Sequence, residues 1–452
     1  MTLEVIILAA GQGSRMRSST PKVLHLLGGK PLLQHVVDAA RSLKPKAVHV
    51  VVGHGAEAVR EAMAGNALNW VQQTEQLGTG HAVLPALDAD STVLVLYGDV
   101  PLVSSAVLQQ LVDAAQQAPA LLTAVLEDPS GYGRVLRDAQ NRFRAVVEHK
   151  DASADELAVS EVNTGILAAP ATLLQRYLPR VGNSNQQREY YLPDVLSLSV
   201  ADGIAVCTAS VADPLEVLGV NDQLQLSRLE RELQRQRAEA LLISGVRLAD
   251  PARIDIRGEL TCGRDVFIDV NCVFTGDVVL GDGVHIGPNC VISDSQIAAG
   301  SEVCAMSHLQ QARVGDSCHV GPYARLRPGT ELAAGARVGN FVETKKAHIG
   351  AGSKVNHLSY IGDCEMGEGA NIGAGTITCN YDGVNKHITR IGDGAFVGSN
   401  ATLVAPVEIG SGGFVAAGST ITREVPTAEL AVARGKQRNI SGWKRPGKKN
   451  KD

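Results

Sequence analysis

The sequence lacks the features of proteins that reside in membranes, leave the cell or bind nucleic acid. In its 452 residues no apolar run approaches the ~18 residues of a membrane span. The apolar run Val5–Ala10 follows Glu4 with no basic segment before it, unlike a signal peptide. With 42 basic and 47 acidic residues, the net charge of −5 offers no basic field to nucleic acid or anionic lipid. We therefore expect a soluble, cytoplasmic protein that binds neither nucleic acid nor membrane.

Cysteine motifs for metals or disulfides are also missing. The eight cysteines form no CxxC, and neither His-x-His nor HExxH accompanies them. We expect most of them to be small core residues in a reducing compartment, rather than zinc ligands or disulfide partners.

The residues that are present form two kinds of sequence pattern, one in each half of the chain. Two domains are expected, because a single hydrophobic core rarely exceeds ~250–300 residues. In residues 1–221, apolar runs that predict strands alternate with patterns that predict helices. The strand segments are Val5–Ala9, Ala47–Val52, Thr92–Tyr97 and Leu121–Leu126, and the helical ones include Pro31–Ser42 and Ser104–Gln117. Uninterrupted apolar strands are typical of a parallel sheet covered on both faces. We predict a Rossmann-like α/β domain with a mostly parallel sheet, whose ligands lie beyond the carboxyl ends of the strands.

From about residue 250 the sequence follows a six-residue repeat. An aliphatic or similar residue recurs at every sixth position, and glycine often follows it. The longest run is Ile391, Val397, Leu403, Ile409, Val415 and Ile421. This period fits neither a helix nor an ordinary strand. It predicts a parallel β-helix in which the aliphatic side chains point inward and stack from coil to coil, and it leaves the handedness open.

A connecting segment separates the two patterns. Asp222–Ile243 is rich in Leu, Glu, Arg and Gln and free of Gly and Pro, which predicts a helix ~30 Å long. A coiled coil is the alternative, although the run is too short to show several heptads. We assign residues 1–221 to the first domain, 222–248 to the linker, 249–425 to the β-helix and 426–452 to a tail. The tail ends with the basic residues Lys444, Arg445, Lys448, Lys449 and Lys451, which we interpret as solvated rather than as a polyanion site.

Residues suited to phosphate and metal gather after the predicted strands of the first domain. Val5–Met16 is a strand followed by a glycine-bearing loop, where backbone N–H groups can approach phosphate oxygens, and Arg15 and Lys22 supply positive charge. It is neither a P-loop nor a GxGxxG motif. Asp99 ends a buried strand, where α/β enzymes hold metal ligands, and Gly219–Asp222 follows from the far end of the domain.

The six-residue phase breaks at three places in the second domain. The steps from Val338 to Ile349, Ile361 to Met366 and Thr378 to Ile391 span eleven, five and thirteen residues. Insertions in solenoids form loops and loops concentrate function, so we expect loops there. His357 lies among these breaks, and histidine is the side chain most often used as a base near neutral pH, here toward an amine. Arg327 and Lys345 are suited to clamp an anion.

Across essentially the whole chain, these segments resemble the bacterial bifunctional N-acetylglucosamine-1-phosphate uridyltransferase / glucosamine-1-phosphate N-acetyltransferase family. The N-terminal motifs are Leu8–Met16 with Pro21-Lys22, Gln76–Gly80, Tyr97–Asp99, Gly131–Arg134, Val147–Lys150, Asn163–Gly165 and Gly219–Asn221. The C-terminal motifs are Arg325–Gly329, Asn340–Lys346, Asn356–Tyr360, Asn371–Thr376 and Cys379–Gly383. Ser14 stands where related sequences often have Thr, and both residues carry a hydroxyl.

For the first domain, the resemblance implies transfer of UMP from UTP to N-acetylglucosamine-1-phosphate with release of pyrophosphate. Asp99 and Asn221 would hold Mg²⁺, while Arg15 and Lys22 would stabilise charge on the phosphates. The nucleotide-binding residues would be Leu8, Ala9, Ala10, Gly11, Gln73, Gly78, Thr79, Tyr97 and Gly98, with Gln73, Gly78 and Thr79 reading uracil. Gly133, Glu148 and Asn163 would hold the sugar. Such in-line phosphoryl chemistry needs positioning and charge neutralisation but no covalent nucleophile.

For the second domain, the resemblance implies acetylation of glucosamine-1-phosphate by acetyl-CoA, the earlier step. His357 would be the base, and Glu343 is our hypothesis for the residue that orients it. Arg327, Lys345, Tyr360 and Asn371 would bind the sugar phosphate, and Ala374, Asn380, Tyr381, Ser399, Ala417 and Arg434 would line the acetyl-CoA site. The family's β-helix is left-handed and forms a homotrimer with shared acetyl-transfer sites.

Two alternatives remain at this point. The β-helix is a non-catalytic platform for a sugar-1-phosphate nucleotidyltransferase, or the chain is a regulatory subunit that has kept both folds. The second predicts loss of Lys22, Asp99 or Asn221, and all three are present.

Overall fold

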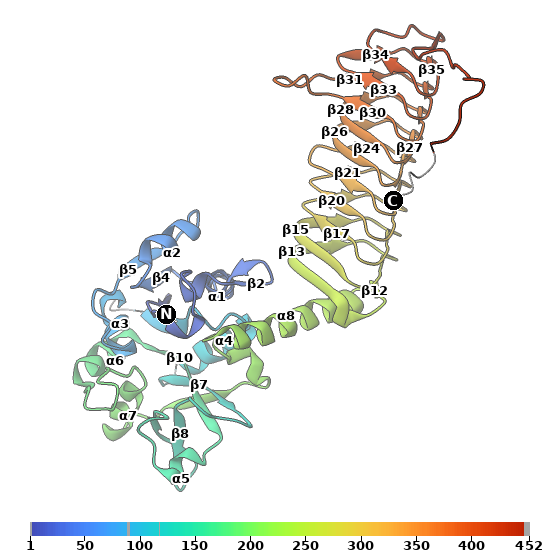
Figure 1. The fold of residues 1–452 in the computed structure, drawn as a ribbon. Helices are drawn as coiled ribbons and strands as arrows, with labels where there is room; N and C mark the ends of the chain where they lie inside the picture. The colour runs from blue at the N-terminus through green and yellow to red at the C-terminus, as the bar shows by residue number, and fades with distance from the viewer. Residues whose placement is uncertain (1, 88–90, 117, 447–452) are drawn as a thin grey trace, which may run out of the picture. The chain divides into compact units, whose positions relative to one another are not determined.

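The chain folds into two compact units, and each is described by itself. The computed structural model describes residues 2–87, 91–116 and 118–446 (Figure 1). The units are Met1–Gln234 and Arg235–Asp452, so the division falls inside helix α8 (Gln223–Ile243). Of the basic run in the tail, Lys448, Lys449 and Lys451 lie outside the described residues. No helix in the described part of the chain is long and apolar enough to cross a membrane.

The first unit contains a sheet with the strand order β11-β7-β10-β6-β1-β4-β5. The bounds are β1 Thr2–Ala9, β4 Ala47–Val52, β5 Asn69–Gln72, β6 Ser91–Tyr97, β7 Ala120–Val125, β10 Glu161–Pro170 and β11 Cys207–Ser210. Strands β6, β1, β4 and β5 are parallel, as are β7 and β11. β10 lies antiparallel between β6 and β7, and the hairpin of β8 (Arg134–Arg137) and β9 (Phe143–Val147) extends from it. The predicted α/β fold is confirmed.

Both faces of this sheet are covered, which explains why its strands are apolar without alternation. On one face, Val5 and Ile7 of β1 belong to a core with residues of α1 (Leu32–Ser42) and α4 (Ser105–Ala114). On the other face, Ile6 and Leu8 pack in a core with α6 (Ala171–Tyr177) and α7 (Asp194–Ala201). The remaining helices are α2 (Ala56–Ala62), α3 (Thr79–Val83) and α5 (Ala154–Leu157). The carboxyl-terminal edge of the sheet is therefore the place left for ligands.

Helix α8 begins one residue after the predicted start and ends at the predicted residue, Ile243. A glycine-containing cap terminates it. Gly245 has a φ of +100°, in the left-handed region that favours glycine. The Val246 N–H donates to the carbonyl of Leu241 and the Gly245 N–H donates to that of Leu242. This pair of bonds is the Schellman motif, which satisfies the last carbonyl groups of a helix.

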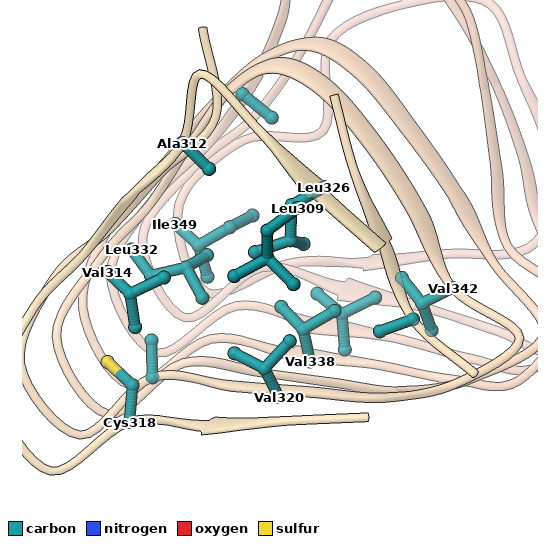
Figure 2. Packing of buried hydrophobic residues seen from close by; sticks show 14 of the residues in the cluster. Leu309, Ala312, Val314, Cys318, Val320, Leu326, Leu332, Val338, Val342 and Ile349 are labelled. Atoms are coloured by element: carbon teal, nitrogen blue, oxygen red, sulfur yellow. The ribbon is translucent and has the colours of Figure 1, made fainter. Parts of the chain in front are cut away.

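The second unit is the predicted parallel β-helix, and its inward side chains form three stacked columns. One sheet follows the order β12-β14-β16-β19-β22-β25-β27-β29-β32-β35-β37, with every pair parallel. In Figure 2, Val314, Leu332 and Ile349 form one column, Leu309 and Leu326 a second, and Val320 and Val338 a third. All these residues are buried, so each coil rests on the aliphatic layer of the one before it.

The short strands of this unit run through the coils in chain order. Their bounds are β12 Arg247–Leu248, β13 Ile254–Cys262, β14 Phe267–Ile268, β15 Cys272–Leu280, β16 His285–Ile286, β17 Val291–Ser293, β18 Gln296–Ile297, β19 Glu302–Val303, β20 His308–Gln310, β21 Arg313–Val314, β22 His319–Val320, β23 Arg325–Leu326, β24 Glu331–Leu332, β25 Arg337–Asn340, β26 Glu343–Ile349, β27 Lys354–His357, β28 Tyr360–Met366, β29 Asn371–Ile372, β30 Ile377–Cys379, β31 Thr389–Ile391, β32 Phe396–Val397, β33 Thr402–Val404, β34 Val407–Ile409, β35 Phe414–Val415, β36 Thr420–Ile421 and β37 Leu430–Ala431. β37 pairs with β35, so the sheet continues past residue 425, where the sequence placed the start of the tail.

Two of the three predicted loops are absent from the described β-helix. Thr344 is buried between Val338 and Ile349 and occupies an inward position of the repeat. The eleven-residue break is therefore a regular six-residue step to Thr344, followed by a five-residue step to Ile349. The strands β26 and β28 run unbroken through these five-residue steps. The same five-residue step occurs from Ile292 to Ile297, both of which are buried. It shortens some coils to 17 residues and leaves others at 18.

Only the third break carries an excursion, which leaves the β-helix between β30 and β31. Within it, Tyr381 and Lys386 form an antiparallel bridge. Asp382 accepts hydrogen bonds from the N–H groups of Val384 and Asn385, and His387 Nε2 lies 2.7 Å from its carboxylate. The hydrogen bond with His387 lowers the pKa of Asp382 well below its usual range. The excursion is therefore a small folded hairpin.

Ile292→Ala should destabilise the second unit, because a cavity inside stacked coils has little freedom to collapse. We expect a loss of about 2–5 kcal/mol in the free energy of unfolding. Val291→Ala is the matched control, since Val291 points outward and is 39% exposed, and it should change stability by less than ~0.5 kcal/mol. Calorimetry of the full chain measures both variants. Equal losses would contradict the inward assignment of Ile292.

Candidate active sites

The glycine-bearing loop after β1 brings Lys22 to the carboxyl-terminal edge of the sheet. Gly13 has a φ of +62°, and a Cβ on it would lie 2.7 Å from Lys22 Cβ. Glycine at position 13 thus lets the two segments touch. Gly98 donates its N–H to the carbonyl of Leu8 at 2.9 Å, so the loop after β6 lies beside the end of β1.

Charged and amide groups from three distant segments meet at this edge. Lys22 Nζ donates to the Asp99 carboxylate, and it lies 3.4 Å from Asn221 Oδ1. Arg15 donates to the same Asn221 oxygen at 2.9 Å. The backbone positions the pair, because the Val220 N–H donates to the carbonyl of Asp99 at 2.8 Å. Both oxygens are thus within reach of one cation, and carboxylate and amide oxygens are the ligands that suit Mg²⁺.

The residues predicted to bind uracil, Gly78 and Thr79, pack against the chain near residue 190. Gly78 has a φ of +114°, and a Cβ there would lie 2.7 Å from the backbone N and O of Tyr190. The Leu192 N–H donates to the Thr79 hydroxyl at 3.0 Å. Gln73 is buried, and its amide donates to the carbonyl of Gly78 at 3.3 Å. These contacts fix the positions of Gln73, Gly78 and Thr79.

The predicted nucleotide-binding residues, except Gly98, line one pocket at this edge. It is lined by Leu8, Ala9, Ala10, Gly11, Lys22, Val23, Gln73, Gln76, Gly78, Thr79, Ala82, Tyr97, Asp99 and Glu189. Sequence reasoning assigned no role to Val23, Ala82 or Glu189. Glu189 lies in the segment that closes over Gly78, and no motif marks that segment.

The residues predicted to hold the sugar also come together. A Cβ on Gly133 would lie 2.9 Å from a Glu148 carboxylate oxygen, and the Asn163 N–H donates to the carbonyl of Gly133 at 2.8 Å. Burial, and then the charge of Asp194, raises the pKa of Glu148. Tyr97 lies under Gly165, where a Cβ would come within 2.5 Å of the ring. Burial raises the pKa of Tyr97, so its hydroxyl stays neutral and can donate.

In the second unit, the coil register places residues predicted for acetyl transfer in one column. His357, Ala374, Ser399 and Ala417 each stand two residues after an inward aliphatic residue. Those aliphatic residues pair in register from coil to coil through β27, β29, β32 and β35. Neighbouring strands lie ~4.8 Å apart, so these residues follow one another in a line along the β-helix at about that spacing per coil. Arg434 donates to the carbonyl of Ala417 at its far end, at 2.7 Å.

The ring of His357 is held by Asn340 and not by Glu343, which corrects our hypothesis. Asn340 Oδ1 lies 2.8 Å from His357 Nδ1, and the two residues are in register on β25 and β27. Glu343 instead accepts from Arg327 at 2.8 Å, with Arg325 at 3.7 Å. Glu343 lies on β26, which belongs to a different sheet of the β-helix from β25 and β27, and it pairs with Tyr360 of β28.

Three cationic side chains, Arg327, Lys345 and Lys386, lie near one another on the side of the β-helix that carries Glu343. The ammonium of Lys386, from the hairpin, is the first cause of a lowered pKa for Lys345, and Arg327 contributes to it. Like charges so close together favour an anion between them. Lys386 was not singled out from the sequence, because only folding of the hairpin brings it to Lys345. Asn380 donates to the Asp363 carboxylate, and the Tyr381 hydroxyl donates to the carbonyl of Gly383 at 2.5 Å. Asn371 is half-buried on β29, in register with Lys354 and Phe396.

Comparisons with known proteins agree with this division. The family model of the MobA-like NTP transferase domain matches residues 5–168, and that of the bacterial transferase hexapeptide (six repeats) matches residues 261–294 and 388–423. The fold and the sites thus define a nucleotidyltransferase joined to a hexapeptide-repeat transferase.

Full-length relatives narrow the class to one family. Proteins named "Bifunctional protein GlmU" are 58% identical in Marinobacter nauticus, 57% in Pseudomonas putida and 56% in Stutzerimonas stutzeri. Each match covers 99–100% of this chain and 99–100% of the relative. The chain belongs to the bifunctional GlmU family. It is a two-activity enzyme of UDP-N-acetylglucosamine synthesis, with a uridylyltransferase and an acetyltransferase in one chain, and the two alternatives left by the sequence are set aside.

Asp194→Asn should stabilise the first unit at neutral pH. Burial, and then the charge of Asp151, raises the pKa of Asp194 from 3.8 to about 6. Because the folded state holds the Asp194 proton more tightly than the unfolded state, the protonated carboxyl favours folding at low pH. This contribution to stability falls as pH rises from the ordinary pKa through the folded-state pKa of about 6. We expect the variant to gain roughly 1–2 kcal/mol at about pH 7.5, discounted for solvent screening, and nothing at about pH 4.

Urea unfolding followed by the fluorescence of Trp70, which lies in β5, measures this effect. A Trp443→Phe background removes the only other tryptophan, so that the signal reports the first unit. An equal gain at both pH values would contradict the assignment to a titrating carboxyl.

Proposed function

We propose that the pocket at the ends of β1 and β6 transfers UMP from UTP to N-acetylglucosamine-1-phosphate, with Mg²⁺ held by Asp99 and Asn221. The contact of Lys22 with both proposed ligands supports this most directly, because one cation already reaches both oxygens. When bound, Mg²⁺ would neutralise charge on the phosphates. Lys22 and Arg15 lie at the same point and would stabilise charge on the α-phosphate and on the leaving pyrophosphate.

The sugar phosphate would attack the α-phosphorus in line from the side of Gly133, Glu148 and Asn163. Glu148 and the Tyr97 hydroxyl are fixed groups that can accept from and donate to sugar hydroxyls. Gln73, Gly78 and Thr79 would hold uracil at the opposite end. Catalysis would rest on alignment of the two substrates, and this needs no covalent intermediate.

For the second activity, we propose that acetyl-CoA lies along the column of Ala374, Ser399 and Ala417, with His357 as the base at its end. An amide oxygen only accepts, so Asn340 Oδ1 requires a proton on His357 Nδ1. Nε2 then carries the lone pair that would take a proton from the 2-amino group of glucosamine-1-phosphate. Arg327, Lys345 and Lys386 would clamp the sugar phosphate, with Tyr360 and Asn371 as further contacts.

The acetyl-transfer site would be shared within a homotrimer. The corner next to the His357 column presents Met306, Tyr323, Phe341 and Leu358, which are 46%, 50%, 55% and 62% exposed. All four have a positive φ between 47° and 60°, where glycine or asparagine is preferred. Large apolar side chains held there favour burial against a second copy of the chain. The phosphate clamp lies on the sheet beyond this corner, so a neighbouring copy seated here could bring base and clamp together.

The two activities should separate by mutation. His357→Ala should lower thiol release from acetyl-CoA about 10²–10⁴-fold, because the amine loses its base, and leave pyrophosphate release from UTP intact. Asp99→Ala should lower pyrophosphate release at least ~100-fold and leave acetyl transfer intact. A coupled assay with glucosamine-1-phosphate, acetyl-CoA and UTP measures both. A parallel loss in either variant would contradict separate sites.

Asn340 should act as a positioning residue for His357. Asn340→Ala should lower kcat for acetyl transfer about tenfold or more, because the ring loses the partner that fixes its tautomer. Asn340→Asp should restore much of the rate and shift its pH profile upward, since a carboxylate stabilises the imidazolium. Glu343→Gln is the comparison, and should raise KM for glucosamine-1-phosphate without moving the profile. An unchanged profile in Asn340→Asp would contradict the role.

A further inference from the structure

Three side chains with metal-binding groups meet on coils of the β-helix that precede the residues proposed for acetyl transfer. Glu302 on β19 and His319 on β22 are in register on adjacent coils, and Cys304 follows Glu302 by two residues. His319 Nδ1 lies 3.1 Å from Glu302 Oε2, and His319 Nε2 lies 3.4 Å from Cys304 Sγ. One donor atom from each residue lies within 4.8 Å of the others.

The repeat makes room for the thiol at this point. Cys304 directly follows the inward Val303, a position that is glycine at 287, 321 and 339. On the next coil, a Cβ on Gly321 would lie only 3.3 Å from Cys304 Cβ. Because that neighbour is glycine, the cysteine side chain fits and its sulfur reaches His319.

The thiol is not poised as a nucleophile. Burial, and then the charge of Glu302, raises the pKa of Cys304 to about 11. The thiol therefore keeps its proton at neutral pH, and Nε2 of His319 can accept it in a hydrogen bond. The side chains of His319 and Glu302 are 45% and 46% exposed, so an ion from solvent can reach the cluster.

We propose that Cys304 and His319 bind a thiophilic divalent metal ion of the Zn²⁺ class, with Glu302 orienting the imidazole. Bonds of about 2.3 Å to sulfur and 2.0 Å to nitrogen at a tetrahedral angle place the two ligand atoms about 3.5 Å apart. The observed separation of Sγ and Nε2 is 3.4 Å. Glu302 at Nδ1 is the carboxylate partner that metal-bound histidines commonly have. Binding releases the thiol proton to solvent, and waters complete the coordination.

Titration of the chelator-treated full chain with Co²⁺ alone tests the site. We expect a thiolate-to-cobalt charge-transfer band in the near ultraviolet that saturates at one ion per chain and is lost when Zn²⁺ is added. The Asp99 and Asn221 pair contains no sulfur, so an ion bound there adds nothing to this band. Cys304→Ser should abolish the band. Cys262→Ser is the matched control, because Cys262 is also half-buried in the β-helix, and should leave the band unchanged.

Two surface variants keep the test decisive if Cys304→Ser does not fold. His319→Gln should weaken Co²⁺ binding at least tenfold, and Glu302→Gln should weaken it about 10–100-fold. Acetyl transfer from acetyl-CoA, which the second unit carries out, should be unchanged in both variants and serves as the measure of its folding. Absence of the band, or its persistence in folded Cys304→Ser or His319→Gln, would overturn the proposal. Alkylation of Cys304 faster than Cys262 at neutral pH, with no effect of Zn²⁺, would instead identify a reactive thiol and also overturn it.

Discussion

Stacking of inward aliphatic side chains sets the register of the second unit, and its surface chemistry depends on that register. Each coil must place its aliphatic residues over those of the coil before it, because a shift by one residue would turn them outward. Once this is fixed, the outward residues also align in columns. The column from His357 to Ala417 and the juxtaposition of Glu302 with His319 are both consequences of core packing. The coil between Ile372 and Val397 carries the hairpin and still returns to register.

The stacked core also supports local conformations that would otherwise be unfavourable. Tyr323 and Phe341 hold left-handed backbone angles at an exposed corner and stack on one another with ring centroids 5.2 Å apart. Such angles cost of order 1–3 kcal/mol each in a bulky residue. They persist because the strands on either side of the corner are held by coils above and below. A corner that is apolar in spite of this cost fits a surface made for contact with another copy.

The first unit achieves alignment differently, by bringing loops to one edge of a sheet. Lys22, Asp99 and Asn221 come from distant parts of the chain. Close approach at Gly13 positions Lys22, and the hydrogen bond from the Val220 N–H to the carbonyl of Asp99 holds Asp99 beside Asn221. The Lys22 ammonium donates to the Asp99 carboxylate. Positive charge is thus held beside the place that we propose for the phosphates and Mg²⁺.

The sequence by itself determined both folds, the connecting helix and most of the residues that line the pocket of the first unit. Hydrophobic period is a local property, and the strand-end motifs carry the pocket residues with them. Tertiary structure decided what depends on distance in space. It assigned His357 to Asn340, brought Lys386 to Lys345, and turned two expected loops into five-residue steps. It also joined Cys304 to His319, which no cysteine spacing motif marks. His357 and Asn340 lie 17 residues apart along the chain and Cys304 and His319 lie 15 apart, so the stacking of adjacent coils brings each pair together. The folding of the hairpin brings Lys386 to Lys345 from further along the chain.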